Sequence, residues 1–264
     1  MSRTLARKAW RVAADPRRTL REALVLRDLL GLRRTASPAL RRARPRRHSA
    51  GVALFISMSD HVFQLKLEGL LATALQLEGY RPVILTLRNA RWAEPYFRAF
   101  GIDEFVYPDE FLSPQRAAEA ERAAAEFLRG EVSVQSLKAL EFRGAAVGQQ
   151  TLSSLSRRFF QGRISLANPE VRGALDDVLT EAMRSVLRGE ELIDRVQPDI
   201  ALFIEKGYAG LGSIYDIALR RGTNVIQFLS VGMHWRNALI FKRYTPETRR
   251  IHPASLSAES WRRV

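Results

Sequence analysis

Residues 51–56 read Gly-Val-Ala-Leu-Phe-Ile, an uninterrupted apolar run. A run this short, with β-branched and aromatic members, is typical of a strand buried on both faces, and therefore of a parallel sheet. Leucines recur at helical spacing over residues 65–77, and Gly79 follows at the place of a helix C-cap. A second apolar run at 82–87 completes a βαβ unit, whose crossover we expect to be right-handed.

The same pattern recurs further along the chain. A fully apolar run at 200–204 and short runs rich in β-branched and aromatic residues at 104–107 and 224–228 predict three more strands. Residues 111–196 show only helical periodicity, a stretch too long for an ordinary strand-to-helix connection, and predict an inserted helical layer. The expected fold class is therefore α/β, with a Rossmann-like parallel sheet, a helical insertion and a basic helical N-terminal arm.

Three segments follow from this pattern: a basic amphipathic arm (1–47), a Rossmann-like domain (48–245) and a tail (246–264). The tail is polar, and its last residues resemble the opening of a helix. We therefore expect it to lead to a second domain that the sequence does not contain.

The arm carries most of the net positive charge. Residues 1–50 hold fifteen Lys or Arg against three acids, a net charge of +12 out of +14 for the chain. Asp15-Pro16 predicts a helix start, and Ser37-Pro38 predicts a turn. Three interpretations are open: a solvated leader with no specific role, an element that meets an anionic membrane surface, or a nucleic-acid contact. The last is disfavoured because Trp10 is the arm's one aromatic residue for stacking on bases.

Composition excludes several classes of protein. The 46% apolar share is that of a globular chain and excludes a disordered one. The chain has no Cys, and its four His stand far apart, so the sequence implies no metal and no cofactor. No segment approaches the apolar length of a membrane span, and no signal core opens the chain. We expect a cytoplasmic protein; under the membrane interpretation of the arm, it is peripheral on the inner membrane.

Candidate site residues follow the predicted strands. In an open parallel sheet, ligands bind beyond the carboxyl ends of the strands, where the loops after residues 56, 204 and 229 would meet. The candidates that these loops and the following helix supply are Ser59, Asp60, His61, Gln64, Glu205, Lys206, Gly207, Tyr208, Gly210, His234 and Trp235.

Three of these residues are candidates for catalysis. A His beside a carboxylate, as in Asp60-His61, can act as a general base toward a hydroxyl. Under the alternative interpretation, Asp60 caps the first helix and His61 fills its first turn. Glu205, at the end of a strand, is the third candidate, and its alternative role is to pair with Lys206 or a nearby Arg.

Three glycines follow the strand at 200–204 in the order G-x-x-G-x-G, at Gly207, Gly210 and Gly212. A glycine-rich turn between a strand and a helix suits a phosphate or a sugar. This spacing differs from that of the dinucleotide fingerprint and of the P-loop. Alternatively, Gly207 permits the turn and Gly210 permits close packing of helix on sheet.

Two parts of the sequence resemble GT-B glycosyltransferases. Phe-Ile-Ser-Met-Ser-Asp-His at 55–61, Leu-Glu-Gly-Tyr at 77–80 and Pro-Val-Ile-Leu-Thr at 82–86 are similar to the first βαβ unit of that fold. Residues 198–222, from Pro-Asp-Ile-Ala to Leu-Arg-Arg-Gly, resemble later N-domain elements of bacterial capsule and surface-polysaccharide enzymes. The resemblance covers about residues 50–245.

The resemblance implies sugar transfer from a nucleotide sugar to an acceptor hydroxyl. In this family the N-terminal domain mainly holds the acceptor, and some inverting members place a catalytic His where His61 stands. Because the sequence stops at Val264, we expect the acceptor-side half of such an enzyme, inactive without a donor-binding domain. The alternative is a non-catalytic membrane-surface module that binds a glycan, a lipid-linked acceptor or a partner protein.

Overall fold

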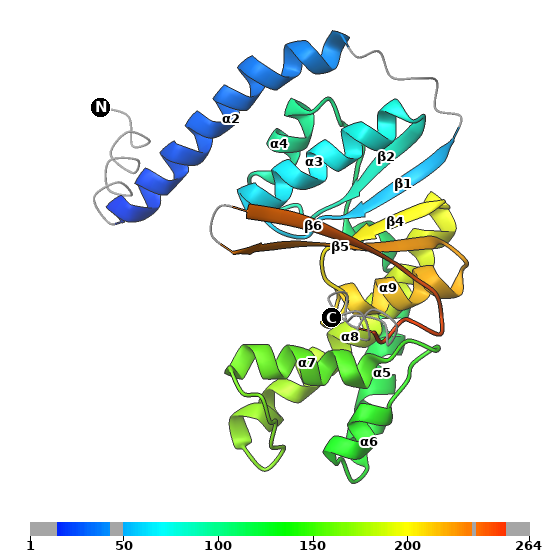
Figure 1. The fold of residues 1–264 in the computed structure, drawn as a ribbon. Helices are drawn as coiled ribbons and strands as arrows, with labels where there is room; N and C mark the ends of the chain where they lie inside the picture. The colour runs from blue at the N-terminus through cyan, green and yellow to red at the C-terminus, as the bar shows by residue number, and fades with distance from the viewer. Residues whose placement is uncertain (1–14, 43–49, 234–235, 252–264) are drawn as a thin grey trace, which may run out of the picture.

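The computed structural model, which describes residues 15–42, 50–233 and 236–251, is an α/β structure built on a six-stranded sheet (Figure 1). The strand order is β3-β2-β1-β4-β5-β6, and every neighbouring pair is parallel except β5 and β6. The strands are β1 (Gly51–Ile56), β2 (Tyr80–Leu85), β3 (Phe105–Val106), β4 (Ile200–Phe203), β5 (Asn224–Met233) and β6 (Arg236–Tyr244). The predicted fold class is confirmed.

Helices cover both faces of the sheet. On one face lie α2 (Pro16–Arg42), α3 (Val62–Leu77) and α4 (Ala93–Ala99) (Figure 1). On the other lie α5 (Pro114–Arg129), α7 (Val147–Phe159), α8 (Pro169–Val196) and α9 (Leu211–Arg220). In the chain, the 3-10 turn η1 (Pro108–Phe111) precedes α5, and α6 (Val134–Ala139) lies between α5 and α7. The stretch predicted to be all-helical therefore forms a layer that extends well beyond the sheet (Figure 1).

The central position of β1 in the sheet explains why its sequence is apolar at every position. Ala53 and Phe55 are buried in the core beneath α3 and α4. Leu54 and Ile56 are buried in the opposite core, with α8 and α9. Because successive side chains of a strand point to opposite faces, a strand covered on both sides must be apolar at every position.

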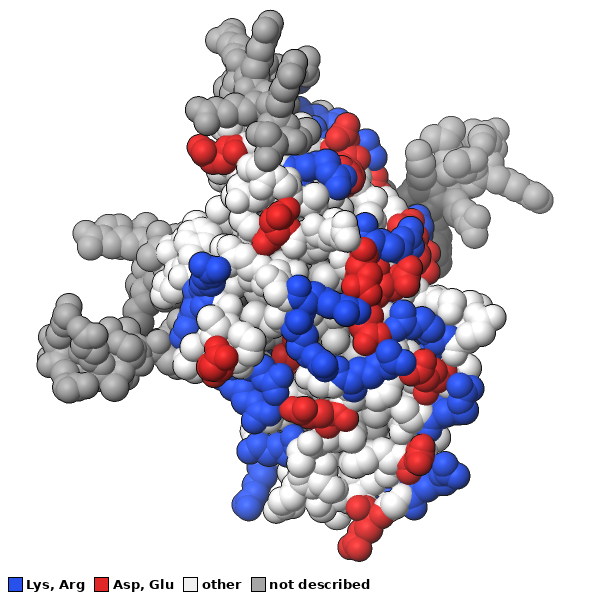
Figure 2. Space-filling view, turned by 90° about the vertical axis from the view of Figure 1, so that its right-hand side faces the viewer, with Lys and Arg blue, Asp and Glu red and all other residues white. Residues whose placement is uncertain are grey.

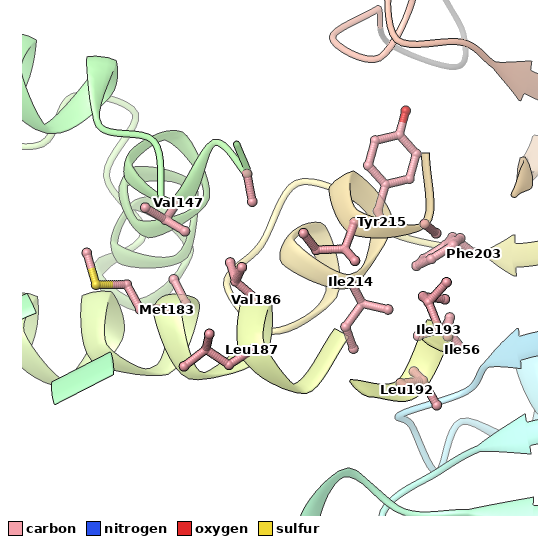
Figure 3. Packing of buried hydrophobic residues seen from close by; sticks show 14 of the residues in the cluster. Ile56, Val147, Met183, Val186, Leu187, Leu192, Ile193, Phe203, Ile214 and Tyr215 are labelled. Atoms are coloured by element: carbon pink, nitrogen blue, oxygen red, sulfur yellow. The ribbon is translucent and has the colours of Figure 1, made fainter. Parts of the chain in front are cut away.

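Helix α8 organises the larger of the two cores. Its start is fixed by Asn168, whose side chain accepts a hydrogen bond of 2.9 Å from the backbone N–H of Glu170, and by Pro169 in the first turn. Further along, Met183 and Val186 lie near α7, and Ile193 lies near β1 and β4 (Figure 3). One helix thus joins the outlying helical layer to the sheet.

The extent of helix α2 differs from the prediction for the arm. It begins at the predicted place but continues through Ser37-Pro38, where a turn was predicted, to Arg42. Pro38 lies close to the end of the helix, so its missing N–H removes one late hydrogen bond. Leu29 is only 3% exposed and packs in the core with α3 and α4, so this part of the arm is docked on the body.

Strand β6 was not predicted from the sequence. The chain after residue 229 was predicted to form a loop, with no strand after it, but β5 runs on to Met233 and pairs with β6. The apolar residues at 238–241 lie in this hairpin, where Phe241 is opposite Phe228. As an edge strand, β6 tolerates the charged residues around them. The predicted tail lies outside the described residues from position 252 onward.

The body is nearly balanced in charge. Figure 2 shows basic and acidic side chains interleaved over the face in view, where they do not form a field of one sign. Arg88, for example, binds both Asp109 and Glu110. Among the described residues, no helix combines the length and the apolar character needed to cross a bilayer.

Candidate binding pocket

The sheet has a topological switch between β1 and β4. The two strands are parallel neighbours, but β1 leads into α3 on one face and β4 leads into α9 on the other. Their trailing loops therefore diverge from adjacent points on the same edge. In open α/β sheets, ligands bind in the crevice that such a divergence leaves.

A pocket of about 810 Å³ opens beside this switch, on the α9 side. Its walls are the β4–α9 loop, α7 with the turn after it, parts of α9 and β5, and residues 249–250. Of the predicted site residues, Glu205, Lys206, Gly207 and Tyr208 line it. The loop after β4 is thus the part of the predicted site that the structure places at a cavity.

The glycines of this loop have separate roles. Gly210 has a φ of 92° and is the N-cap of α9, so it permits the turn from loop to helix. At Gly212 a Cβ would lie 2.5 Å from the carbonyl oxygen of Lys206. Close packing, predicted for Gly210, therefore falls on Gly212.

The loop after β1 is used differently. Both carboxylate oxygens of Asp60 accept hydrogen bonds of 2.8 Å, from the backbone N–H groups of Arg91 and Trp92 at the start of α4. Asp60 therefore caps α4, not α3 as the alternative interpretation had it. His61 is exposed at the N-cap of α3, and its backbone N–H donates to Ser59 Oγ. Of the described residues that line the pocket, none comes from this loop.

Gln64 belongs to a buried polar group beneath the sheet edge. Its side-chain amide donates a hydrogen bond of 2.8 Å to Glu68, which also accepts one from the hydroxyl of Ser57. Burial raises the pKa of Glu68 to about 7, against the opposing effect of these two donors. The sequence analysis missed Glu68, because a single Glu on an apolar helix gives no sign of its burial.

Most of the third predicted loop is strand, because residues 230–233 belong to β5. His234 and Trp235 lie outside the described residues, between β5 and β6. Strand β5 contributes Gln227 to the pocket wall, and the Gln227 side chain donates a hydrogen bond of 2.9 Å to the carbonyl of Ile204. The phenol of Tyr244 donates to the same Gln227 side chain, and burial raises the pKa of that phenol to about 12.

Lys206 is the most unusual cation of the pocket. Its ammonium lies 4.5 Å from the ring centroid of Tyr244 and 5.2 Å from that of Tyr215, and it donates a hydrogen bond to the carbonyl of Arg249. Burial, opposed by Asp216 and aided by nearby Lys242, lowers the pKa of Lys206 to about 8. Lys206 is therefore a cation at neutral pH that an anionic ligand would stabilise.

The floor of the pocket is a buried hydrogen-bond network. Asp216 accepts hydrogen bonds of 2.9 Å from the side chain of Gln150 and from the backbone N–H of Ala146. The other end of the Gln150 amide accepts a bond of 2.6 Å from the hydroxyl of Ser213. Burial raises the pKa of Asp216, although the Ala146 N–H and the charges of Arg249 and Lys206 act in the opposite direction. The network holds α7 against α9 and fixes the shape of the cavity.

The mouth of the pocket carries an aromatic side chain in an unusual position. Phe160 follows α7 with a φ of 52° and is 94% exposed. Nearby on α7, the guanidinium of Arg157 lies 4.7 Å from the ring centroid of Tyr208. Aromatic faces and guanidinium groups at a polar cavity suit a polyhydroxylated ligand that carries negative charge.

The wall formed by α7 was not predicted. Its pocket-lining residues are Gln149, Gln150, Ser153, Ser156 and Arg157. They are spaced as the polar face of an amphipathic helix, and a polar face against solvent has the same sequence signature. Arg249 and Arg250 reach the pocket from beyond β6, which was not predicted either.

Among the described residues, no three His, Asp or Glu side chains come together as a metal site. No protein-family model matches the chain, and no curated protein or solved structure is similar enough to count as a match. Functional inference for this protein therefore rests on the pocket itself.

Proposed function

We propose that the pocket binds the acceptor of a sugar-transfer reaction, and that the chain is the acceptor-side half of a glycosyltransferase of bacterial surface-polysaccharide biosynthesis. The observation that carries the proposal is the pocket of about 810 Å³ beside the β1–β4 switch. Its amides, hydroxyls and aromatic rings are the groups that bind sugars, and its cations suit an acceptor with phosphate or carboxylate groups.

In the proposed reaction, the acceptor hydroxyl lies near Glu205 and loses its proton to that carboxylate. The acceptor oxygen attacks the anomeric carbon of a nucleotide sugar, and the nucleotide leaves with the electrons of the broken bond. A separate α/β domain holds the nucleotide sugar, as in the family that the sequence resembles. His61 is the alternative base, from the adjacent loop on the same sheet edge.

A non-catalytic glycan-binding role is the second candidate. The observation that favours it is the position of Asp60, whose two oxygens bind the N-terminus of α4. Asp60 is therefore occupied by a structural task and does not orient His61 as the carboxylate of a catalytic pair would.

The binding step is tested with the purified chain on an array of bacterial surface glycans. The strongest-binding oligosaccharide is then titrated by calorimetry. We expect Tyr208→Ala and Lys206→Met to weaken binding about tenfold or more, through loss of one stacking or charged contact. Tyr208→Phe is the conservative control. The proposal fails if no glycan binds, or if the variants bind as well as the wild-type protein.

The catalytic step is tested in an extract of the source cells that lacks this protein and receives labelled nucleotide sugars. Adding back wild-type chain should restore transfer of the label, and Glu205→Gln should not, although it still binds the glycan. Restoration by Glu205→Gln but not by His61→Ala would move the role of base to His61. Restoration by both variants would favour the non-catalytic role.

A further inference from the structure

The two acids within helix α2 both face the body of the protein. Glu22 pairs with Arg91, at 2.5 Å. Asp28 pairs with the ammonium of Lys66, at 2.8 Å, and accepts a hydrogen bond of 2.7 Å from the hydroxyl of Tyr96. The negative charge of the helix is thus neutralised on its inner side, and its orientation on the body is fixed.

The other charged side chains of α2 that the structure describes are positive and exposed to solvent. They are Arg17, Arg21, Arg27, Arg33 and Arg34. Within the part of the chain that the structure describes, no carboxylate pairs with any of them. The outer face of α2 therefore has a single sign of charge.

The same outer face carries apolar side chains. Leu20 is 62% exposed and Leu24 is 53% exposed. Leu20 lies nine residues, or two and a half helical turns, from the buried Leu29, so it points away from the body. Arg27 and Arg34 follow Leu20 at seven-residue steps and share its side of the helix.

Helix α3 continues this surface. Phe63 and Leu70, each 58% exposed, lie one turn before and one turn after Lys66, the residue that binds Asp28 of α2. A groove of about 470 Å³ lies between the two helices and is lined by residues that include Leu24 and Lys66. Among the described residues of α3, only Lys66 lines this groove, and Phe63 and Leu70 lie one turn to either side of it on the same helix.

We propose that the outward faces of α2 and α3 dock on an anionic lipid surface. The leucines and Phe63 enter the boundary between headgroups and acyl chains, and Arg27 and Arg34 bind lipid phosphates. Charge decides against a second copy of the chain on this face, because two such faces would bring arginines against arginines. The exposed leucines favour lipid over nucleic acid, because they offer bases no aromatic ring on which to stack. This inference does not rest on the proposed sugar chemistry.

The experiment is flotation of the full chain with vesicles. We expect binding to vesicles of equal phosphatidylcholine and phosphatidylglycerol, and little to phosphatidylcholine alone. Arg27→Gln with Arg34→Gln should weaken partition about thirtyfold, since each cation near such a surface contributes about 1 kcal/mol. The matched control, Arg122→Gln with Arg129→Gln on exposed positions of α5, removes the same charge and should leave partition unchanged.

The apolar contribution is tested separately. Leu20→Gln with Leu24→Gln should weaken partition about tenfold or more, and Leu20→Met with Leu24→Met should retain it, because Met keeps the apolar surface. Equal binding of the Gln and wild-type proteins would overturn the proposal. A dimer of the wild-type protein, measured by light scattering and abolished by Leu20→Gln with Leu24→Gln, would also overturn it. Binding to DNA as tight as binding to the mixed vesicles would overturn it as well.

Discussion

The carboxylate of Asp216 accepts a hydrogen bond of 2.9 Å from the side-chain amide of Gln150, and this bond joins α9 to α7 beneath the pocket. Both residues are buried, and both line the cavity. Gln150→Leu should therefore leave the Asp216 carboxylate with one donor fewer and lower the free energy of unfolding by about 1–3 kcal/mol. Urea denaturation checks this value. The neighbouring variant Gln149→Leu, outside the network, should have a smaller effect.

The raised pKa of Glu68 predicts a pH dependence of stability. Because burial raises this pKa from its ordinary 4.5 to about 7, the contribution of Glu68 to stability is fully present below about pH 4.5 and is lost as pH rises through 7. Glu68→Gln should flatten this dependence and be more stable than wild type at pH 8, by up to about 3 kcal/mol. Melting temperatures from pH 4 to pH 8 measure it. Glu78→Gln, at an exposed site, should follow the wild-type curve.

Substitution of Asp60 should lower the stability of the protein more than substitution of His61. Asp60→Ala removes the acceptor for two backbone N–H groups at the start of α4 and should cost about 1–2 kcal/mol of stability. His61→Ala, at an exposed N-cap whose side chain makes no capping bond, should cost much less. Chemical denaturation of both variants decides the point. Equal losses would mean that Asp60 does not act as a cap.

The contacts of Asp28 should hold α2 on the body. Although burial opposes it, hydrogen bonds from Lys66 and Tyr96 lower the pKa of Asp28, so its contribution to stability is lost as pH falls through that lowered pKa. Asp28→Ala should speed hydrogen exchange across α2 about tenfold, the equivalent of one charged hydrogen bond. Asp109→Ala, which removes an exposed pair with Arg88, is the control and should not change exchange in α2.

Lys206 should titrate well below the ordinary pKa of a lysine. Burial, opposed by Asp216 and aided by Lys242, places its pKa at about 8. After reductive methylation with labelled formaldehyde, one lysine resonance should shift with a midpoint near pH 8 and be missing in Lys206→Met. A midpoint above pH 10 for every lysine would contradict the burial of this ammonium.

Local sequence patterns were sufficient to predict every strand of the sheet except β6. The strands β1, β2 and β4 were predictable because each is short and followed by residues at helical spacing; β1 and β4 are apolar throughout, and β2 is apolar from Pro82 onward. Strand β6 was missed because its apolar residues are flanked by charges, which an edge strand tolerates and a buried strand does not.

For the site, sequence order was informative only where the residues directly follow a strand. Glu205 to Tyr208 were predicted at a pocket on that ground, and they line one. Asp60 binds an element that begins about thirty residues later, and no local pattern encodes such a partner. Arg249 reaches the pocket from the segment after β6, about forty residues beyond the loop that follows β4.

The switch between β1 and β4 has a mechanical consequence. Because the sheet separates the two helical layers, the described residues that line the pocket come from α7, α9 and their neighbours, and none comes from α2 or α3. The proposed lipid contact of α2 and the proposed ligand site are thus on opposite sides of the sheet. Substitutions that retune one of these tasks are free to accumulate without disturbing the other.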